Sequence, residues 1–548
     1  MPTDQLRTIL FLGLAMVLFL LWQAWQQDYG SLQQQPVSEA SQDDTVAEGS
    51  PDVPQAPKAP AGAGPSTQVP GTTALVGGQP IHVRTDLFDA EIDAVGGNLR
   101  RLDLLKYSVS VDRPNVPFSL FSDQLPDLFV AQSGLLGSQS TPDHHATFEA
   151  ERSAYVLEEG QDRLEVNLRW ENPAGIQATK VYTFRRGSYV IDITYHVTNP
   201  TENAWTGRMY GQFQRTEPPS QGGIGFVYTY TGGVLSTPEN PYEKIKFGEI
   251  AKEDLNATAK GGWIAMIQHY FLGAWVPSQE TLNHFYTNAV PGPRYVIGVM
   301  LPETTIASQG SGSLQMSLFA GPKIQDRLEQ VAPFLNRTVD YGWLWFIAQP
   351  LFWLLEFIHD WVGNWGWAII LLTVLIKLAF FHLSAASYKS MARMRKLQPR
   401  LTALRERHGD DRARMNQAMM DLYKKEKINP LGGCLPIVVQ IPVFIALYWV
   451  LLESVELRQA GFMFWIDDLS TYDPFFVLPI LMGITMFLQQ RLNPAPPDPI
   501  QAKIMMALPF VFTFFFLFFP SGLVLYWFVN NLLSIAQQWV ITRRIASE

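Results

Sequence analysis

Apolar residues gather near the N-terminus and after Trp343, whereas residues 81–330 have the polarity of an ordinary soluble domain. A membrane span needs about 20 mostly apolar residues. One candidate lies near the start, within 8–25. We expect five more at about 364–383, 432–452, 475–490, 504–519 and 522–541, with a tight helical hairpin at Pro520-Ser521-Gly522 between the last two. The pattern predicts six spans in total.

A spacer follows the first apolar run. The run has no clear small-x-small cleavage site after it, and Trp22 and Trp25 suit an interfacial anchor. We therefore favour a retained anchor at residues 1–27 over the alternative, a cleaved signal peptide. Residues 28–80 are rich in Gln, Pro, Ala, Gly and Ser, a composition that cannot bury a core. We expect a disordered linker without chemistry.

Polar and apolar positions alternate through residues 81–330. Clear examples are 163–170 (RLEVNLRW), 180–184 (KVYTF) and 189–197 (YVIDITYHV). Alternation with period two indicates half-buried strands, and we predict one large all-β sandwich domain. The sole cysteine, Cys434, excludes an intramolecular disulfide, so this domain must be held together by its core.

The predicted β domain shows no catalytic constellation. Its histidines lack metal-type spacing to acids or cysteines, and we interpret them as ordinary surface or core residues. The histidines in question are His144, His145, His196 and His269. A GxxxxGK[ST] phosphate loop is also absent from the sequence. We expect neither a metal nor a cofactor.

Residues 331–362 combine many aromatic side chains with polar ones such as Gln349, Glu356 and His359. This mixture is typical of an amphipathic helix that lies in the membrane interface. Pro350 predicts a break in that helix. Residues 363–548 would then form the helical membrane core.

Charge predicts the orientation in the membrane. The net charge of −9 averages over unlike regions and says little by itself. Residues 384–430 are strongly basic, whereas the loop 453–474 carries one arginine among five acids. Because basic loops stay in the cytoplasm, we expect both termini in the cytoplasm and the β domain outside.

The basic segment has the apolar spacing of a helical hairpin at 385–427. Its charges would form a docking surface for ribosomal RNA, a targeting factor or another partner, without reading a specific nucleic-acid sequence. The alternative is that they serve orientation and contact with anionic lipids, and the sequence leaves both open. The candidate contacts are Arg393, Arg395, Lys396, Arg405, Arg407, Arg543 and Arg544.

Lys377 lies inside an apolar run, where a charge costs about 2.5–3.5 kcal/mol by insertion scales. The other apolar runs carry no Asp or Glu in their interiors. Polar residues in three predicted helices indicate a hydrated groove around this cation, and the alternative is that Lys377 snorkels to the cytoplasmic side. The predicted groove residues are Lys377, Thr373, Gln440, Trp527, Asn530 and Ser534, with Gln537 and Gln538 continuing the stripe on the last helix.

Methionine and phenylalanine are concentrated in the later spans. Such adaptable side chains suit varied apolar clients, and they are also ordinary packing or lipid-facing residues. We call the candidates the hydrophobic slide. They are Met482, Met486, Met505, Met506, Phe510 and Phe514.

A cation in a polar groove beside an apolar wall would lower the barrier for both parts of an amphiphilic polypeptide. That is the task of a membrane-protein insertase, driven by burial of apolar client residues at about 0.8 kcal/mol per CH₂. A secondary transporter is one rival, but the spans lack an intramembrane carboxylate and a visible inverted repeat. A sensor is the other, but the spans feed no catalytic cytoplasmic domain.

Five stretches of the helical part carry a family resemblance: YKSMARMRKLQPRL at 388–401, NPLGGCLPIVVQIPVFIALY at 429–448, SVELRQA at 454–460, LPILMGIT at 478–485 and FPSGLVLY at 519–526. They resemble the bacterial YidC family of membrane-protein insertases, relatives of the mitochondrial Oxa and chloroplast Alb proteins. Together with the anchor, linker and β domain, the resemblance covers the whole chain.

This resemblance implies a periplasmic β-supersandwich, a five-helix insertase core and a place in the bacterial inner membrane. It puts Lys377 where members have an Arg or Lys lining a groove open to cytoplasm and lipid, Thr373 beside it, and Trp527 at a client-contacting aromatic that is often Tyr. It implies a chaperone rather than an enzyme. The implied partners are nascent membrane proteins, the Sec translocase with its accessory subunits, translating ribosomes, signal-recognition targeting factors and membrane lipids.

Overall fold

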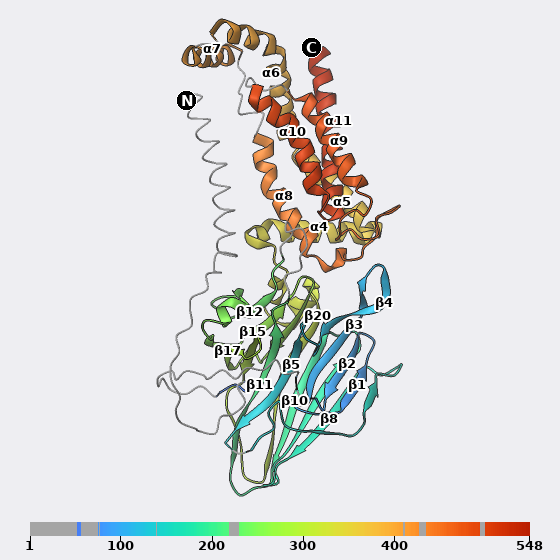
Figure 1. Ribbon diagram of the computed structural model, residues 1–548, viewed down its shortest axis with the longest axis vertical. Helices are drawn as coiled ribbons and strands as arrows, with labels where there is room; N and C mark the ends of the chain where they lie inside the picture. The colour runs from blue at the N-terminus through green and yellow to red at the C-terminus, as the bar shows by residue number, and fades with distance from the viewer. Residues whose placement is uncertain are drawn as a thin grey trace.

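The computed structural model describes residues 52–55, 75, 77–138, 140–218, 229–408, 411–426, 435–493 and 499–547. A β domain is followed by a helical region, and the two lie at opposite ends of an elongated molecule (Figure 1). The predicted anchor at 1–27 lies outside the described residues, as do Cys434 and most of the predicted linker at 28–80.

Two large sheets form the β domain, which confirms the predicted all-β sandwich. One sheet has eleven strands and the other nine. Their inner faces meet in one hydrophobic core, where the rings of Phe213 and Trp275 lie 5.8 Å apart between centroids. Among the described strands, β1 and β7 pair in parallel and the other ladders are antiparallel.

The strand order places residues from distant parts of the chain side by side. The eleven-stranded sheet runs β14 (Asn256–Lys260), β17 (Leu282–Val290), β18 (Arg294–Met300), β11 (Trp205–Thr216), β5 (Phe129–Gly137), β3 (Asn98–Ser110), β2 (Phe88–Asp93), β1 (Pro80–Arg84) and β7 (Ala154–Val156), with β19 (Thr304–Ile306) beside β11 and β4 (Arg113–Phe121) beside β3. The nine-stranded sheet runs β13 (Glu243–Ile245), β12 (Gly232–Ser236), β15 (Trp263–Ile267), β16 (Phe271–Val276), β20 (Gly310–Pro322), β10 (Val190–Asn199), β9 (Gln177–Arg185), β8 (Arg163–Glu171) and β6 (Glu149–Ala150).

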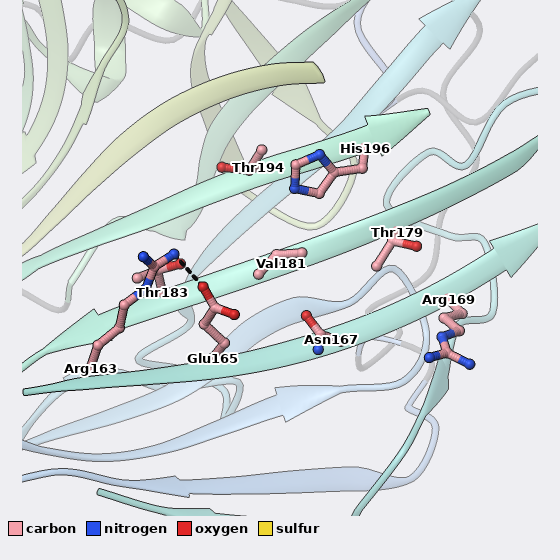
Figure 2. A pocket seen from close by; sticks show the side chains of 9 residues that line it. All are labelled: Arg163, Glu165, Asn167, Arg169, Thr179, Val181, Thr183, Thr194 and His196. Atoms are coloured by element: carbon pink, nitrogen blue, oxygen red, sulfur yellow. Dashed lines mark ion pairs between the residues drawn. The ribbon is translucent and has the colours of Figure 1, made fainter. Parts of the chain in front are cut away.

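Strand β8 shows how alternation builds the sandwich. Val166 and Leu168 point into the core and are fully buried. The intervening side chains face outward and, with those of β9 and β10, line a shallow polar depression of about 320 Å³ (Figure 2). Arg163 and Glu165 form an ion pair there. The depression is the solvated face of an antiparallel sheet.

Helices make up the rest of the described chain. Most short ones lie within or just after the β domain, and the longer ones, with one short helix between two of them, form the helical region. In chain order they are α2 (Phe247–Ile250), α3 (Gln325–Val331), η1 (Leu335–Thr338), η2 (Gly342–Leu344), α4 (Trp345–Val362), α5 (Trp365–Ala379), α6 (Phe381–His408), α7 (Arg412–Lys425), α8 (Leu435–Glu453), η4 (Val455–Leu457), α9 (Val477–Leu492), α10 (Pro499–Phe516) and α11 (Ser521–Ser547).

Helix α4 crosses between the β domain and the other long helices (Figure 1). Phe352, Leu355 and Ile358 are buried on one face, whereas Trp353 and Phe357 are exposed on the other, stacked on one another. The predicted break at Pro350 is wrong, because α4 continues through it. Pro350 is the sixth residue of α4, so its missing N–H removes only one bond close to the helix start.

Each predicted core span overlaps a helix, but the first is bent. Helix α5 ends at Ala379 rather than continuing to 383, and α6 begins two residues later. At the bend, Gln537 of α11 donates to the carbonyl oxygen of Phe381 at 3.3 Å, and helices kink where a side chain bonds into the backbone ladder. No single helix in the described ranges has both the length and the apolar character of a span. Helix α5 and the part of α6 up to Leu397 have them together across a bend of 67°.

Helices α6 and α7 form the basic segment and lie at the end of the helical region remote from the β domain (Figure 1). Arg400 of α6 donates to Glu426, just after α7, at 2.7 Å. This ion pair joins the last third of α6 to the far end of α7. The two residues that link the helices, 409–410, are outside the described residues.

The β domain contacts the segment that follows α8. Arg458 Nη2 and Gln459 Nε2 donate to the carbonyl oxygen of Ser108 on β3, at 2.6 and 3.0 Å. His269, between β15 and β16, lies with Nε2 2.8 Å from the carbonyl oxygen of Leu452. Burial lowers the pKa of His269 to about 3, so the neutral ring donates its Nε2 proton here.

A buried ion pair reinforces this contact. Lys323 directly follows β20, and its Nζ lies 3.8 Å from Oε2 of Glu453 at the end of α8. The two side chains are 1% and 4% exposed. Removing one partner of such a pair leaves an uncompensated buried charge. The β domain is therefore joined to α8 by buried contacts as well as by the chain.

Candidate functional site

Lys377 of α5 is bonded to a neutral partner on α11. Its Nζ donates to Ser534 Oγ at 2.8 Å, and Ser534 Oγ in turn donates to the carbonyl oxygen of Asn530 at 2.7 Å. No carboxylate of the described chain forms an ion pair with Lys377. Within the described residues, Lys377 is thus bonded to a neutral hydroxyl, and no acidic side chain neutralises its charge.

A second polar contact lies one turn along α11. Gln440 of α8 donates from Nε2 to Asn530 Oδ1 at 3.1 Å. Asn530 and Ser534 share one face of α11, since four residues make about one turn. Helices α5, α8 and α11 thus meet around four of the predicted groove residues. We call Lys377, Gln440, Asn530 and Ser534 the polar cluster.

Thr373 is not bonded to this cluster. Its hydroxyl donates to the carbonyl oxygen of Ile369, one turn earlier in α5, at 2.7 Å, and the side chain is buried. Sequence periodicity correctly put Thr373 one turn before Lys377. It does not reveal that the hydroxyl is already satisfied by its own helix, as threonine often is.

Trp527 lies one turn before Asn530, at an aromatic border of the cluster. Its ring centroid is 4.8 Å from that of Phe444 on α8 and 5.3 Å from that of Phe516 on α10. The indole N–H is buried and has no hydrogen-bond partner in the part of the chain that is described. A donor is therefore available next to an apolar surface.

The other polar residues of α11 diverge to different neighbours. Gln538 donates to the carbonyl oxygen of Leu492 at 3.2 Å, at the end of α9, whereas Gln537 faces the α5–α6 bend. Sequence reasoning missed a buried amide contact between Asn531 and Thr485 of α9, at 3.5 Å. The signal was present, because Asn531 adjoins Asn530 and successive helical residues face different directions.

The hydrophobic slide divides into an exposed and a packed part. Met506, Phe510 and Phe514 are exposed and recur every four residues on α10, so they form one face. Met505 of α10 and Met486 of α9 are half-buried. Met482 is fully buried against the neighbouring helices and belongs to the core instead of a surface.

Most of the predicted basic contacts are exposed. This holds for Arg393, Arg395, Lys396 and Arg407 of α6. Arg543 is exposed near the end of α11 and stacks on Trp539, with 4.4 Å between the guanidinium carbon and the ring centroid. The structure does not describe the side chains of Arg405 and Arg544.

The fold and this cluster define a class of protein. A large β-sandwich precedes a helical region whose centre combines a cation, amides and hydroxyls with exposed apolar side chains. Two family models match the chain in succession, the YidC periplasmic domain over residues 80–354 and the 60Kd inner membrane protein over residues 357–548. The β domain is thus a periplasmic domain, and the helical region is that of an inner-membrane protein.

Close relatives extend along the full chain. The membrane protein insertase YidC of Nitrosococcus oceani is 54% identical and matches 100% of both chains. That of Methylococcus capsulatus is also 54% identical, over 99% of this chain and 98% of the relative. A crystal structure of an active YidC insertase with its first transmembrane domain resolved is 18% identical, covers 82% of this chain and 90% of that chain, and has a TM-score of 0.38. The chain belongs to the YidC family of membrane protein insertases, which are chaperones of membrane proteins and not enzymes.

Proposed function

We propose that this protein inserts integral proteins into the bacterial inner membrane and helps them fold and assemble, alone or together with the Sec translocase. Family membership over the full chain supports this function. The observation that carries the mechanism is the bond from Lys377 to the neutral Ser534. A hydroxyl orients the ammonium group without cancelling its charge, so an acidic or polar segment of a client can replace it.

The polar cluster is the proposed substrate groove, open to cytoplasm and lipid. Gln440 and Asn530 offer exchangeable donors and acceptors to the polar part of a client. Trp527 stands at the border, and the exposed face formed by Met506, Phe510 and Phe514 receives the apolar part. Burial of that part supplies about 0.8 kcal/mol per CH₂ group, and no nucleotide is required.

The topology proposed is six spans with both termini in the cytoplasm. The basic helices α6 and α7 lie at the end of the helical region opposite the periplasmic domain, together with the end of α11 (Figure 1). Retention of positive charge in the cytoplasm supports this orientation. The cytoplasmic helical hairpin and the retained anchor at 1–27 belong to the same proposal.

The partners proposed are the translating ribosome, signal-recognition targeting factors and the Sec translocase with its accessory subunits. Exposed arginines of α6 and Arg543 support a contact with an acidic surface such as ribosomal RNA. Anionic lipid is the competing ligand for the same charges. If these arginines bind the ribosome, neutralising Arg393 and Arg395 together should reduce ribosome binding. The measurement is made in detergent, where no lipid bilayer competes for the charges.

Charge reversal at Lys377 tests the groove. Changing attraction to repulsion alters the interaction with a nearby acidic group by about 2 kcal/mol even at a water-like dielectric. Lys377→Glu should therefore slow insertion of a client with an acidic translocated tail by on the order of tenfold, measured by protease protection in proteoliposomes. Lys377→Arg should preserve insertion. As a matched control, Lys503→Glu reverses an exposed charge on α10, outside the cluster, and should have little effect.

Equal insertion by Lys377→Glu and the native chain would refute the role of this charge. Photocrosslinking from Asn530 and Trp527 to a ribosome-bound nascent membrane protein provides a second test and separates an insertase from a transporter or a sensor. Thr373 is the matched position, because its side chain is buried and bonded to Ile369. We expect strong crosslinks from the first two positions and weak ones from Thr373.

A further inference from the structure

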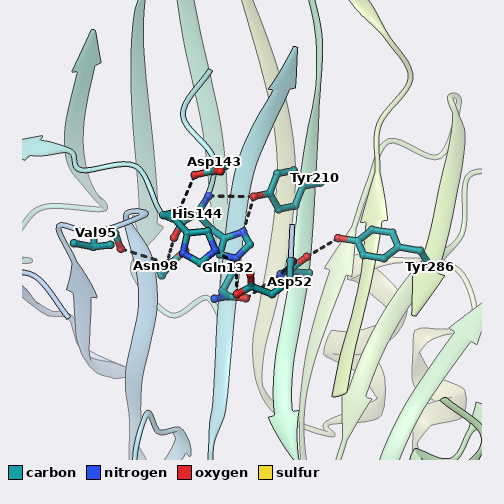
Figure 3. Close-up of polar contacts among 10 residues, drawn as sticks. Asp52, Val95, Asn98, Gln132, Asp143, His144, Tyr210 and Tyr286 are labelled. Carbon is teal, nitrogen blue, oxygen red and sulfur yellow. Dashed lines mark hydrogen bonds and ion pairs between the residues drawn. The ribbon is translucent and has the colours of Figure 1, made fainter. Parts of the chain in front are cut away.

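Asp52, His144 and His145 come together in the periplasmic domain, and Figure 3 shows Asp52 beside His144. The two histidines lie in the loop between β5 and β6, and Asp52 comes from the segment that the sequence predicts to be a spacer without chemistry. Asp52 Oδ2 is 3.3 Å from His144 Nε2, and Asp52 Oδ1 is 2.9 Å from His145 Nε2. One ligand atom from each residue lies within 4.8 Å of the other two.

His144 directs an unsatisfied nitrogen into this cluster. The residue is 1% exposed, and its Nε2 makes no hydrogen bond although Asp52 is close. On the other side of the ring, Nδ1 lies 2.6 Å from the hydroxyl oxygen of Tyr210, which also accepts the backbone N–H of His144 at 3.1 Å. A phenol oxygen has two lone pairs. Tyr210 can therefore hold the proton on Nδ1 and leave the lone pair on Nε2 for a ligand.

Hydrogen bonds from neighbouring residues hold all three residues, and Figure 3 shows the contact of Asn98 with His144. Asn98 Nδ2 donates to the carbonyl oxygen of His144 at 2.8 Å, and the backbone N–H of His145 donates to Asp143 at 2.9 Å. Gln212 Nε2 donates to the backbone carbonyl of Asp52 at 3.0 Å. A site whose ligands are held by a surrounding shell of hydrogen bonds loses little entropy when it binds a ligand.

We propose that Asp52, His144 and His145 form a binding site for a divalent transition-metal ion, with Zn²⁺ as the best match. Two imidazole nitrogens and one carboxylate oxygen are a usual zinc donor set with an open fourth position. Zn–N distances near 2.0–2.1 Å put tetrahedral ligand atoms about 3.4 Å apart, close to the separation of His144 and Asp52. The side chain of His145 is 42% exposed, so the ion can enter from the periplasm and water can fill the fourth position.

A metal ion here would fasten the segment around Asp52 to the periplasmic domain. Without the ion, Asp52 contacts the histidines only through its carboxylate oxygens, and its backbone accepts the bond from Gln212. With the ion, three strong ligand bonds would join residues far apart in the chain. The site is distant from the polar cluster, so it does not depend on the proposed insertion mechanism.

Metal analysis of the tag-free full-length protein in detergent tests the proposal. After incubation with Zn²⁺ and gel filtration, we expect one bound zinc ion per chain, and Co²⁺ in its place should show the intense visible absorption of a tetrahedral site. Asp52→Asn and His145→Ala should each weaken binding at least tenfold. Both positions tolerate change, since Asp52→Asn keeps the side-chain shape and His145 is partly exposed.

His196→Ala is the matched control, because His196 is an exposed histidine of the same domain that lies outside the cluster. It should bind zinc as the native chain does. Two results would overturn the proposal: no bound metal in the native chain, which would leave an ordinary Asp–His contact, or binding that survives in Asp52→Asn and His145→Ala. Unfolding curves of each variant, followed by tryptophan fluorescence, verify that the domain stays folded.

Discussion

At the residue scale, Lys180 shows that the interior of the periplasmic domain accommodates a lysine side chain. It is fully buried between the sheets, and its Nζ donates to the carbonyl oxygens of Gly96 and Ser133 at 3.0 and 3.2 Å. Three aromatic rings surround it, with that of Tyr182 5.2 Å away. Burial holds the pKa of Lys180 well below its ordinary value, because the ammonium form loses its hydration.

This shift makes stability depend on pH. Between the lowered pKa and the ordinary value near 10.5, the unfolded chain binds more protons than the folded chain, so stability rises with pH in that interval, by up to about 1.4 kcal/mol per pH unit. Lys180→Met should remove this contribution, and Lys260→Met, which changes an exposed lysine, should retain it. Urea unfolding between pH 7 and 9.5, followed by tryptophan fluorescence, measures the slope. Equal slopes in all three proteins would contradict the prediction.

At the site, some residues could be predicted from the sequence, but the bonds between them could not. Lys377 could be identified from its cost in an apolar run, and Asn530, Ser534 and Gln440 from their polarity, because such residues must find partners in a low-dielectric setting. The individual bonds could not be predicted, since they depend on how three helices rotate against one another. Asp52 and His144 were missed because no local pattern links them. They meet only after the sheet has formed.

At the element scale, α9 and α10 approach closely at Gly483. A Cβ atom at this position would fall well inside van der Waals contact of Thr513 Oγ1 on α10. Small residues at helix interfaces let membrane helices pack closely. The sequence indicates the presence of these helices and their ends within a few residues. It does not indicate the bend after α5, which depends on the tertiary contact with Gln537, or the passage of α4 through Pro350, which depends on where the helix begins.

Gly483→Ala should therefore push α9 and α10 apart and destabilise the helical region by about 1–3 kcal/mol, the usual cost of overpacking. Adding Thr513→Ala removes the clashing oxygen and should recover most of the loss. Ile484→Ala, at the neighbouring exposed position, serves as the control for a change in side-chain size. Thermal unfolding in detergent provides the comparison. If the double variant is no more stable than Gly483→Ala, contact with Thr513 is not the cause of the lost stability.

At the scale of the whole molecule, the periplasmic domain is fastened to the membrane core through α8. Lys323 and Glu453 are buried together, and Arg458, Gln459 and His269 add hydrogen bonds around them. Neither Lys323 nor Glu453 could be singled out from the sequence as a partner in an ion pair. Both lie at element ends, where charged residues are common, and only the docking of two domains buries them.

Removing one charge should cost more than removing both. Glu453→Gln leaves Lys323 buried without its partner and should destabilise the contact by about 3–5 kcal/mol, whereas Lys323→Met with Glu453→Leu should be close to neutral. Hydrogen exchange of the backbone amides at 453–459 reports on the contact, and Arg327→Met, an exposed cation nearby, is the control. A double variant that is no more stable than Glu453→Gln would contradict this account.

After Ser521, the next Ser, Asn or Gln of α11 is Asn530, and Leu523, Val524, Leu525 and Tyr526 between them are all buried. The hydroxyl of Ser521, at the start of the helix, donates to the carbonyl oxygen of Thr471 in the loop between α8 and α9. If water fills the proposed groove up to the polar cluster, the cytoplasmic electrical potential extends with it. The transmembrane voltage then falls mainly across the packed turn around Tyr526. An acidic client tail held at Lys377 would cross most of that voltage, about 2.3 kcal/mol per charge and 100 mV, in a single short step.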